Sequence, residues 1–157
     1  MKPFHYKIHK LQTDSQLPYS LLLLADETIE AIDNYISDSE VYILYKEEIT
    51  TPIAVFALHK NSDYEVEIKN IAVAKEEQSK GIGSYLLDEI KKIAQKSKYK
   101  QLIVGTGDCN FGQLHFYEKN GFIKYATRKD FFIENYPEPI IENGIRLRDM
   151  ILLKHEL

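Results

Sequence analysis

Two glycines, Gly81 and Gly83, stand between a strand-like run at residues 65–74 and a helix-like run at residues 84–96. Glycine has no Cβ, so the backbone can turn tightly there and come close to an anion. The first turn of a helix leaves N–H groups unpaired and directs the positive end of the helix dipole at the preceding turn. A strand, a glycine turn and a helix start in this order predict a phosphate-binding site.

Two common phosphate-binding motifs do not fit this turn. A P-loop needs four residues between its glycines, followed by Gly-Lys-Ser/Thr, and the segment lacks that pattern. A dinucleotide fingerprint needs a glycine or alanine three residues after its second glycine, where this chain has Leu86. A glycine turn that only caps a helix remains the structural alternative.

Residues 78–83, with the sequence Gln-Ser-Lys-Gly-Ile-Gly, are similar to the Gln/Arg-x-x-Gly-x-Gly/Ala signature of the GNAT superfamily. Members of that superfamily are acyl-CoA-dependent N-acyltransferases, and the signature binds the pyrophosphate of CoA. Residues 116–122, Phe-Tyr-Glu-Lys-Asn-Gly-Phe, resemble the aromatic-Tyr-x-x-x-Gly-Phe segment that ends the last helix in many members. The resemblance covers nearly the whole chain. It implies an N-acetyltransferase that transfers the acetyl group of acetyl-CoA directly to a primary amine of a small molecule or peptide.

Hydrophobic periodicity and turn residues predict an α+β protein whose sheet is flanked by helices. The resemblance implies the GNAT fold, a mixed and mostly antiparallel sheet with a splayed central strand pair, in a single domain over residues 1–157. The expected order is strand, two helices, three strands, helix, strand, helix and two strands, at 4–9, 18–25, 26–36, 41–45, 53–59, 65–74, 84–96, 101–105, 110–121, 122–128 and 147–153.

The resemblance also implies which residues bind acetyl-CoA. Backbone amides of the glycine turn would hold the pyrophosphate, and the strand before the turn would pair with the pantetheine arm, as a peptide pairs with a strand edge. Lys80 is either a charge contact or a solvated lysine, and Asn110 is an N-cap, a cofactor contact or both. The expected cofactor residues are Ile71, Ala72, Val73, Gln78, Ser79, Lys80, Gly81, Ile82, Gly83, Ser84, Asn110 and Tyr117.

Two residues are expected to be catalytic. By the resemblance, Tyr117 is the general acid that protonates the departing thiolate, since a phenol stays protonated at neutral pH. A tyrosine that only packs is the alternative. Glu67, four residues before Ile71, resembles a glutamate that serves some protein-acetylating members as general base. Its alternative is a solvated polar face shared with Glu65 and Lys69. The lone Cys109 is expected to be a small buried thiol rather than a nucleophile.

The long segment at residues 130–144 is aromatic and acidic, and loops of this length in compact domains are usually functional. It resembles a subgroup of small bacterial members for which no acceptor is specified. Its carboxylates and aromatic rings could receive a cationic amine, or the rings could only hold the loop on the sheet or face a second subunit. The expected substrate residues are Asp130, Phe131, Tyr136, Glu138 and Glu142.

Composition narrows the remaining choices. The chain has 157 residues and a net charge of −4, which gives no reason to expect nucleic acid as a partner. The most apolar stretch, Leu21–Ala25, is too short to span a bilayer, and a single cysteine fits a reducing compartment, so we expect a cytoplasmic protein. The histidines and the cysteine lack ligand spacing, so no metal is expected.

Two other functions are compatible with the glycine turn. A non-catalytic acyl-CoA-binding sensor or scaffold would use the turn and the strand but would not need Tyr117 or Glu67. A nucleotide-binding domain would use the turn for ATP or NAD. We also expect a homodimer, and this expectation comes from the family resemblance and not from any residue pattern.

Overall fold

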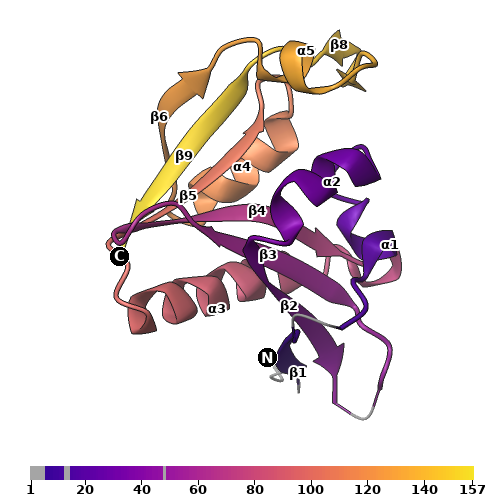
Figure 1. The fold of residues 1–157 in the computed structure, drawn as a ribbon, viewed down its shortest axis with the longest axis vertical. Helices are drawn as coiled ribbons and strands as arrows, with labels where there is room; N and C mark the ends of the chain where they lie inside the picture. Colours follow the sequence, from indigo (N-terminus) through magenta and orange to yellow (C-terminus); the bar gives the residue numbers. More distant parts are fainter. Residues whose placement is uncertain (1–5, 13–14, 48) are drawn as a thin grey trace. The chain divides into compact units, whose positions relative to one another are not determined.

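The computed structural model describes residues 6–12, 15–47 and 49–157. They form two compact units (Figure 1). One unit comprises Met1–Lys60 and Ile68–Asp88, and the other comprises Asn61–Glu67 and Glu89–Leu157. Two elements are shared, because both β4 (Glu65–Val73) and α3 (Ile82–Lys96) run from one unit into the other. The single domain expected over residues 1–157 stays a prediction.

The first unit is built on four strands in the order β1-β2-β3-β4. β1 pairs antiparallel with β2, with Ile8 opposite Leu44, and β2 pairs antiparallel with β3, with Ile43 opposite Val55. Two short helices precede β2 and a single 3₁₀ turn follows β4. The elements that lie wholly in this unit are β1 (Tyr6–Lys10), α1 (Tyr19–Leu22), α2 (Ile29–Ile36), β2 (Ser39–Lys46), β3 (Ala54–Lys60) and η1 (Lys75–Glu77).

Helices α1 and α2 cover one face of these strands, α1 against β3 and α2 against β2. Thr28 begins α2 as its N-cap, since its hydroxyl accepts a hydrogen bond from the Ala31 N–H at 3.0 Å. The alternation of each strand sends every second side chain to the helices. The buried residues of this core are Leu21, Leu22, Ile32, Ile36, Val41, Ile43, Val55, Ala57, Ala72 and Ala74.

The second unit contains the first residues of β4 and three further strands, in the order β4-β5-β9-β6. β9 pairs antiparallel with both neighbours: Val104 of β5 lies opposite Leu153, and Thr127 of β6 lies opposite Ile151. The pairing of β6 is interrupted by an irregularity between Lys124 and Ala126. The elements that lie wholly in this unit are β5 (Gln101–Gly107), α4 (Phe111–Lys119), β6 (Ile123–Arg128), α5 (Phe131–Asn135), β7 (Ile141–Glu142), β8 (Ile145–Arg146) and β9 (Met150–Glu156).

The structure confirms the order of the expected elements and changes some of their bounds. The expected helix at 18–25 is the short α1, and the last expected strand begins at Met150 instead of Leu147. The segment at 130–144 is not a plain loop, because it contains α5 and β7, the first strand of the β7–β8 hairpin. Phe4 and His5 of the first expected strand, and Glu48 between the strands expected at 41–45 and 53–59, lie outside the described residues.

Candidate acetyl-CoA site and catalytic residues

The glycine turn has the backbone that a phosphate-binding turn needs. Ser79 and Gly81 both have positive φ, +63° and +83°, so the chain reverses sharply before α3 begins at Ile82. The Gly81 carbonyl accepts the first hydrogen bond of the helix from the Tyr85 N–H at 3.1 Å, which makes Gly81 the N-cap. The first-turn N–H groups of a helix have no partner within it, and they point back at this exposed turn.

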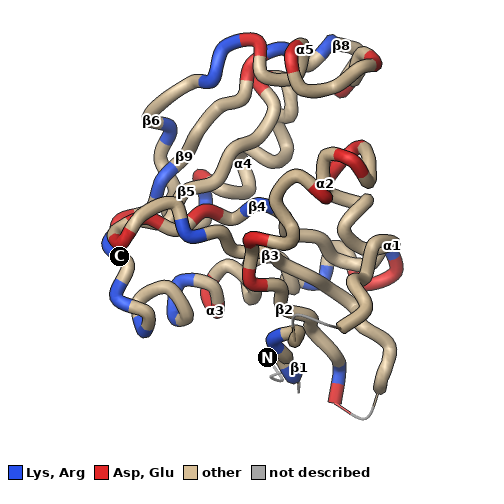
Figure 2. Tube along the Cα trace, in the orientation of Figure 1, with Lys and Arg blue, Asp and Glu red and all other residues tan. Residues whose placement is uncertain are grey.

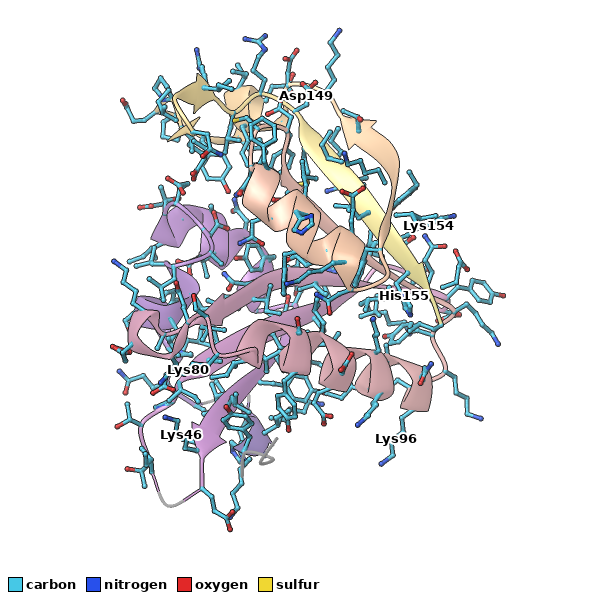
Figure 3. The ribbon with its side chains drawn as sticks, turned by 180° about the vertical axis from the view of Figure 1, so that it is seen from behind. Lys46, Lys80, Lys96, Asp149, Lys154 and His155 are labelled. Atoms are coloured by element: carbon cyan, nitrogen blue, oxygen red, sulfur yellow. The ribbon has the colours of Figure 1, made fainter. Side chains whose placement is uncertain are left out.

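Charged side chains pair next to the turn, and two of them, Lys46 and Lys80, are labelled in Figure 3. Glu77 accepts from Lys46 Nζ at 2.8 Å and from Lys80 Nζ at 3.3 Å on the same oxygen. These hydrogen bonds, with that from Lys46 the stronger cause, hold the pKa of Glu77 below its usual value. Lys80 is therefore neither freely solvated nor buried: it is paired at the surface, with Lys46 as a second cation that the sequence pattern did not indicate.

The strand before the turn holds the other cofactor residues expected in this unit. Ala72 is buried against α1 and α2, whereas Ile71 and Val73 are half-buried. The Gln78 side chain donates from Nε2 to the Val73 carbonyl at 2.9 Å. Gln78 thus fixes the end of β4 to the turn. This structural role is additional to the cofactor contact that is expected of Gln78.

Tyr117 lies in α4 and is 3% exposed. Its ring contacts the rings of Phe116 and Phe122, with centroids 5.1 and 5.6 Å away, and no described residue hydrogen-bonds its hydroxyl. Burial raises the pKa of Tyr117, so the phenol keeps its proton at any physiological pH. The helix ends as expected at Gly121, whose φ is +94°, and the Phe122 N–H returns to the Tyr117 carbonyl at 3.0 Å.

Cys109 and Asn110 directly precede the same helix. Asn110 is its N-cap, because the side-chain oxygen accepts from the Gln113 N–H at 3.4 Å. Cys109 is buried, and burial raises the pKa of its thiol, which is the opposite of what a nucleophile requires. The expected buried thiol is therefore confirmed, and the N-cap reading of Asn110 holds without excluding a cofactor contact.

Glu67 does not lie on a solvated face, since it is 3% exposed. Its Oε1 accepts from Asn61 Nδ2 at 3.0 Å and lies 3.9 Å from the Arg128 guanidinium. Burial of a carboxylate is costly unless it is paired, and both partners supply that pairing. A buried carboxylate with fixed orientation is compatible with a general base, whereas the solvated alternative is wrong.

The aromatic side chains of the expected substrate segment contact one another. Phe131 meets Phe132 edge to face, and Phe132 stacks on Tyr136 with centroids 5.7 Å apart. Phe132 and Tyr136 also cover the buried cluster of Cys109, Ile140 and Leu147. These contacts give Tyr136 a packing role, so a substrate role for this residue stays a prediction.

The expected carboxylates of that segment differ in their surroundings. Asp130 pairs with Arg148 at 3.3 Å, and its backbone N–H donates to Asp149 at 2.8 Å. Glu138 is exposed and Glu142 is half-buried in β7. Asp130 therefore already has a cationic partner within the chain, and Glu138 is the more open of the three.

The sequence model of the acetyltransferase (GNAT) family matches residues 6–122. The chain belongs to this family. It is 40% identical over 147 residues to an uncharacterized N-acetyltransferase of Bacillus subtilis, which covers 93% of this chain and 92% of the relative. The expected enzyme class, an acyltransferase of the GNAT family, is thereby confirmed, and a non-catalytic module is not favoured.

Solved structures of GNAT enzymes share the fold. A GNAT acetyltransferase of Elizabethkingia anophelis, solved with acetyl-CoA bound, has a TM-score of 0.92 and 44% identity and covers 98% of this chain and 99% of its own. An acetyltransferase of Bacillus subtilis in complex with CoA has a TM-score of 0.84 and 36% identity, covering 97% and 99%. The expected GNAT fold, a mixed and mostly antiparallel sheet with flanking helices, is confirmed.

Some residues that contact the expected site residues were not indicated by the sequence pattern. Lys46 reaches Glu77 from β2, while Asn61 and Arg128 hold Glu67 from a turn and from β6. All three are polar residues without a motif, and only the fold brings them to their partners.

Across the described parts of the chain, no helix is both long and apolar enough to cross a membrane, and no three metal-ligating side chains converge.

Proposed function

We propose that this GNAT acetyltransferase transfers the acetyl group of acetyl-CoA to a primary amine by direct attack, without a covalent enzyme intermediate. The observation that carries this proposal is the turn at 78–83, with positive φ at Ser79 and Gly81 and the start of α3 immediately after it. Two enzymes with full-length similarity were solved with acetyl-CoA or CoA bound, which supports the choice of acyl donor.

In the first unit, the proposed task is binding of the donor. The backbone amides at the start of α3 bind the pyrophosphate, because an N-terminal helix turn offers unpaired N–H groups and a positive dipole end. Ile71, Ala72 and Val73 offer backbone groups to the pantetheine arm and an N–H to the thioester oxygen. A donor aimed at the developing oxyanion is the usual means of lowering the barrier to acyl transfer.

In the second unit, the proposed task is proton transfer. Tyr117 donates a proton to the departing thiolate: burial keeps its phenol protonated before the reaction, and no described residue competes for the hydroxyl by hydrogen bonding. Glu67 accepts the proton of the attacking amine, directly or through a water.

A single cysteine and the family of the chain support the cytoplasm as the location of the protein. A homodimer stays a prediction, which size-exclusion chromatography with light scattering would test.

Calorimetric titration with CoA and acetyl-CoA, followed by a thiol-release assay over a panel of amines, tests the proposal. We expect saturable binding of both cofactors and release of free CoA with at least one amine. Competition by desulfo-CoA, but not by ATP or NAD, is expected to exclude the nucleotide-binding alternative. Absence of cofactor binding would mean that the glycine turn has another role. Binding without turnover on any amine would favour a sensor.

A further inference from the structure

The Arg128 guanidinium has more hydrogen-bond donors than the described residues use. Its Nη2 lies 3.9 Å from Glu67 Oε1, and its Nη1 lies 3.8 Å from the sulfur of Met150, which is a weak acceptor. Both contacts are longer than a charge-assisted hydrogen bond to a carboxylate, which measures about 2.7–2.9 Å. The Arg128 side chain is also 40% exposed. Arg128 therefore keeps donors for an anion that reaches it from solvent.

The Arg128 side chain reaches Glu67 across two strands, since β5 and β9 lie between β6 and β4. Met150 of β9 is opposite Arg128 of β6 and opposite Gly107 of β5, so these three residues share one face of the sheet. Gly105, two residues before Gly107, lies on the same face, and a Cβ added there would collide with the Met150 sulfur. The missing side chain at Gly105 thus gives Met150 the room to lie against the guanidinium.

No second carboxylate of the described chain neutralises Arg128. Asp130, two residues away, pairs with Arg148 at 3.3 Å, and only Glu67 among the described residues forms an ion pair with Arg128. Residues 119–129, which include β6, contain three lysines and one arginine but no carboxylate (Figure 2). The charge around Arg128 therefore attracts an anion from solvent.

Glu67 supplies the opposite charge next to this cation. It is 3% exposed, and Asn61 Nδ2 donates to its Oε1 at 3.0 Å. A molecule that carries a carboxylate and an amine on the same carbon can place the carboxylate on Arg128 and the amine at Glu67, directly or through a water. An amine with its anionic group at a distant position would reach only one of the two. The planar fork of a guanidinium also matches a carboxylate in two parallel hydrogen bonds.

Tyr125 of β6 lies near the same pair. Burial raises the pKa of Tyr125, and the carboxylates of Glu65 and Glu67 add to the rise, whereas Arg128 opposes it. The phenol therefore stays protonated at neutral pH. A neutral hydroxyl does not compete with a carboxylate for the charge of Arg128.

We propose that the acceptor of the acetyl group is an α-amino acid, with its carboxylate bound by Arg128 and its amine at Glu67. This inference rests on the proposed acetyl transfer and names its substrate class. The amine nitrogen forms a bond to the acetyl carbon and the carbon–sulfur bond of acetyl-CoA breaks. Glu67 takes the proton of the amine and Tyr117 gives one to the thiolate. Arg128 determines specificity, because the carboxylate that it binds takes no part in the transfer.

Acetylation of matched pairs tests the proposal: each common L-amino acid is compared with its α-amide. The amide keeps the amine and the side chain but lacks the charge that Arg128 would bind. Amidation also makes the amine easier to deprotonate, so a preference for the acid cannot come from the amine itself. We expect kcat/KM to be about tenfold or more higher for the preferred amino acid than for its amide. Equal or faster turnover of every amide overturns the proposal.

Substitution of Arg128 assigns that preference to its side chain. Arg128→Gln should lower kcat/KM by about tenfold or more for the amino acid and by less than about twofold for the amide, with an unchanged Kd of CoA. Arg128→Lys keeps a charge beside Glu67 and loses the fork, so it should lose about fivefold for the amino acid and remain folded. Lys124→Gln, which removes an exposed cation from the same strand, is the matched control and should behave like the wild type. Equal losses for acid and amide would mean that Arg128 acts only on Glu67, and would overturn the assignment, as would full activity of Arg128→Gln.

Calorimetric titration with the same amino acids, with and without CoA present, separates this proposal from the acetyl transfer. We expect the preferred amino acid to bind about tenfold more tightly than its amide, and Arg128→Gln to remove this difference. If no amino acid binds or is acetylated while another amine releases CoA, the inference is overturned and the proposed function stands. Absence of CoA binding and of thiol release with every amine counts against the proposed function itself, and the titration without CoA still decides whether Arg128 binds a carboxylate.

Discussion

Alanine substitution in the turn at 78–83 tests whether backbone conformation alone decides if a glycine-to-alanine change raises or lowers the stability of the protein. A Cβ added at Gly81 or at Gly112 would meet no heavy atom within 4 Å, so neither substitution by alanine creates a clash. The two sites differ in φ, which is +83° at Gly81 and lies outside the left-handed range at Gly112 in α4. Any difference between Gly81→Ala and Gly112→Ala must therefore come from the backbone.

The magnitudes follow from that difference. An L-residue in the left-handed region costs about 1–2 kcal/mol, partly offset by the lower entropy of the unfolded chain, so Gly81→Ala should lose about 1 kcal/mol. Alanine in a helix is about 0.5–1 kcal/mol better than glycine, so Gly112→Ala should gain that amount. For a domain of this size 1 kcal/mol corresponds to roughly 2–4 °C in Tm, and the two variants should differ by about 5 °C.

Thermal and urea unfolding of the two variants measures this difference directly. Gly144→Ala supplies a third case, because Gly144 also has a positive φ, +75°, and open space around its Cβ, but lies in the β7–β8 hairpin. We expect it to lose stability like Gly81→Ala. Only Gly81→Ala should also weaken CoA binding, by about tenfold or more, since the turn at 78–83 is the proposed pyrophosphate site. A shift of all three variants in one direction would refute the reasoning from φ.

Three further outcomes are expected. Tyr117→Phe should lower kcat by about 10²-fold or more with CoA affinity and fold retained, because all its described side-chain contacts are made by the ring. Since burial raises the Tyr117 pKa above its ordinary 10.0, the native state holds this proton more tightly than the unfolded state. The resulting stability is complete below pH 10 and is lost as the pH rises further, so urea titrations at pH 8 and 11 should show a smaller loss for Tyr117→Phe than for the wild type. Glu67→Gln, which keeps the shape of the side chain, should lower turnover by about 10²-fold in the thiol-release assay while CoA still binds; full activity of this variant would remove Glu67 from the mechanism. Cys109 should react with a thiol reagent such as DTNB only on unfolding, because the thiol is buried and its pKa is raised, and rapid labelling of the native protein would contradict this.

The features that sequence predicted well are those set by local chemistry. The glycine turn, the Asn110 cap and the end of α4 at Gly121 each depend on residues within a few positions of one another. Cap residues and positive-φ glycines have strong intrinsic preferences, so a short segment is enough to place them. The same holds for the hydrophobic face of α3, which a period of 3.6 residues marks without any tertiary information.

The structure of the segment at 130–144 could not be predicted from its local sequence. Its prolines and acidic residues are typical of a loop, yet five of its residues form α5 and two more form β7, which pairs with β8 immediately after the segment. Neither element is stable alone, because isolated short helices and two-stranded ribbons are marginal in water. They form where Phe132 and Tyr136 can cover Cys109, Ile140 and Leu147, and that cluster joins parts of the chain that are distant in sequence.

Buried polar groups show most clearly what the sequence of a single strand cannot predict. Alternation along β4 places Glu67 and Asn70 on opposite faces of the strand, but it does not say that either side chain is buried. Burial depends on partners that the strand pattern does not reveal: Tyr35 for Asn70, and Asn61 and Arg128 for Glu67. Because a polar group can be buried only where such partners exist, these two positions report on the tertiary structure rather than on the strand.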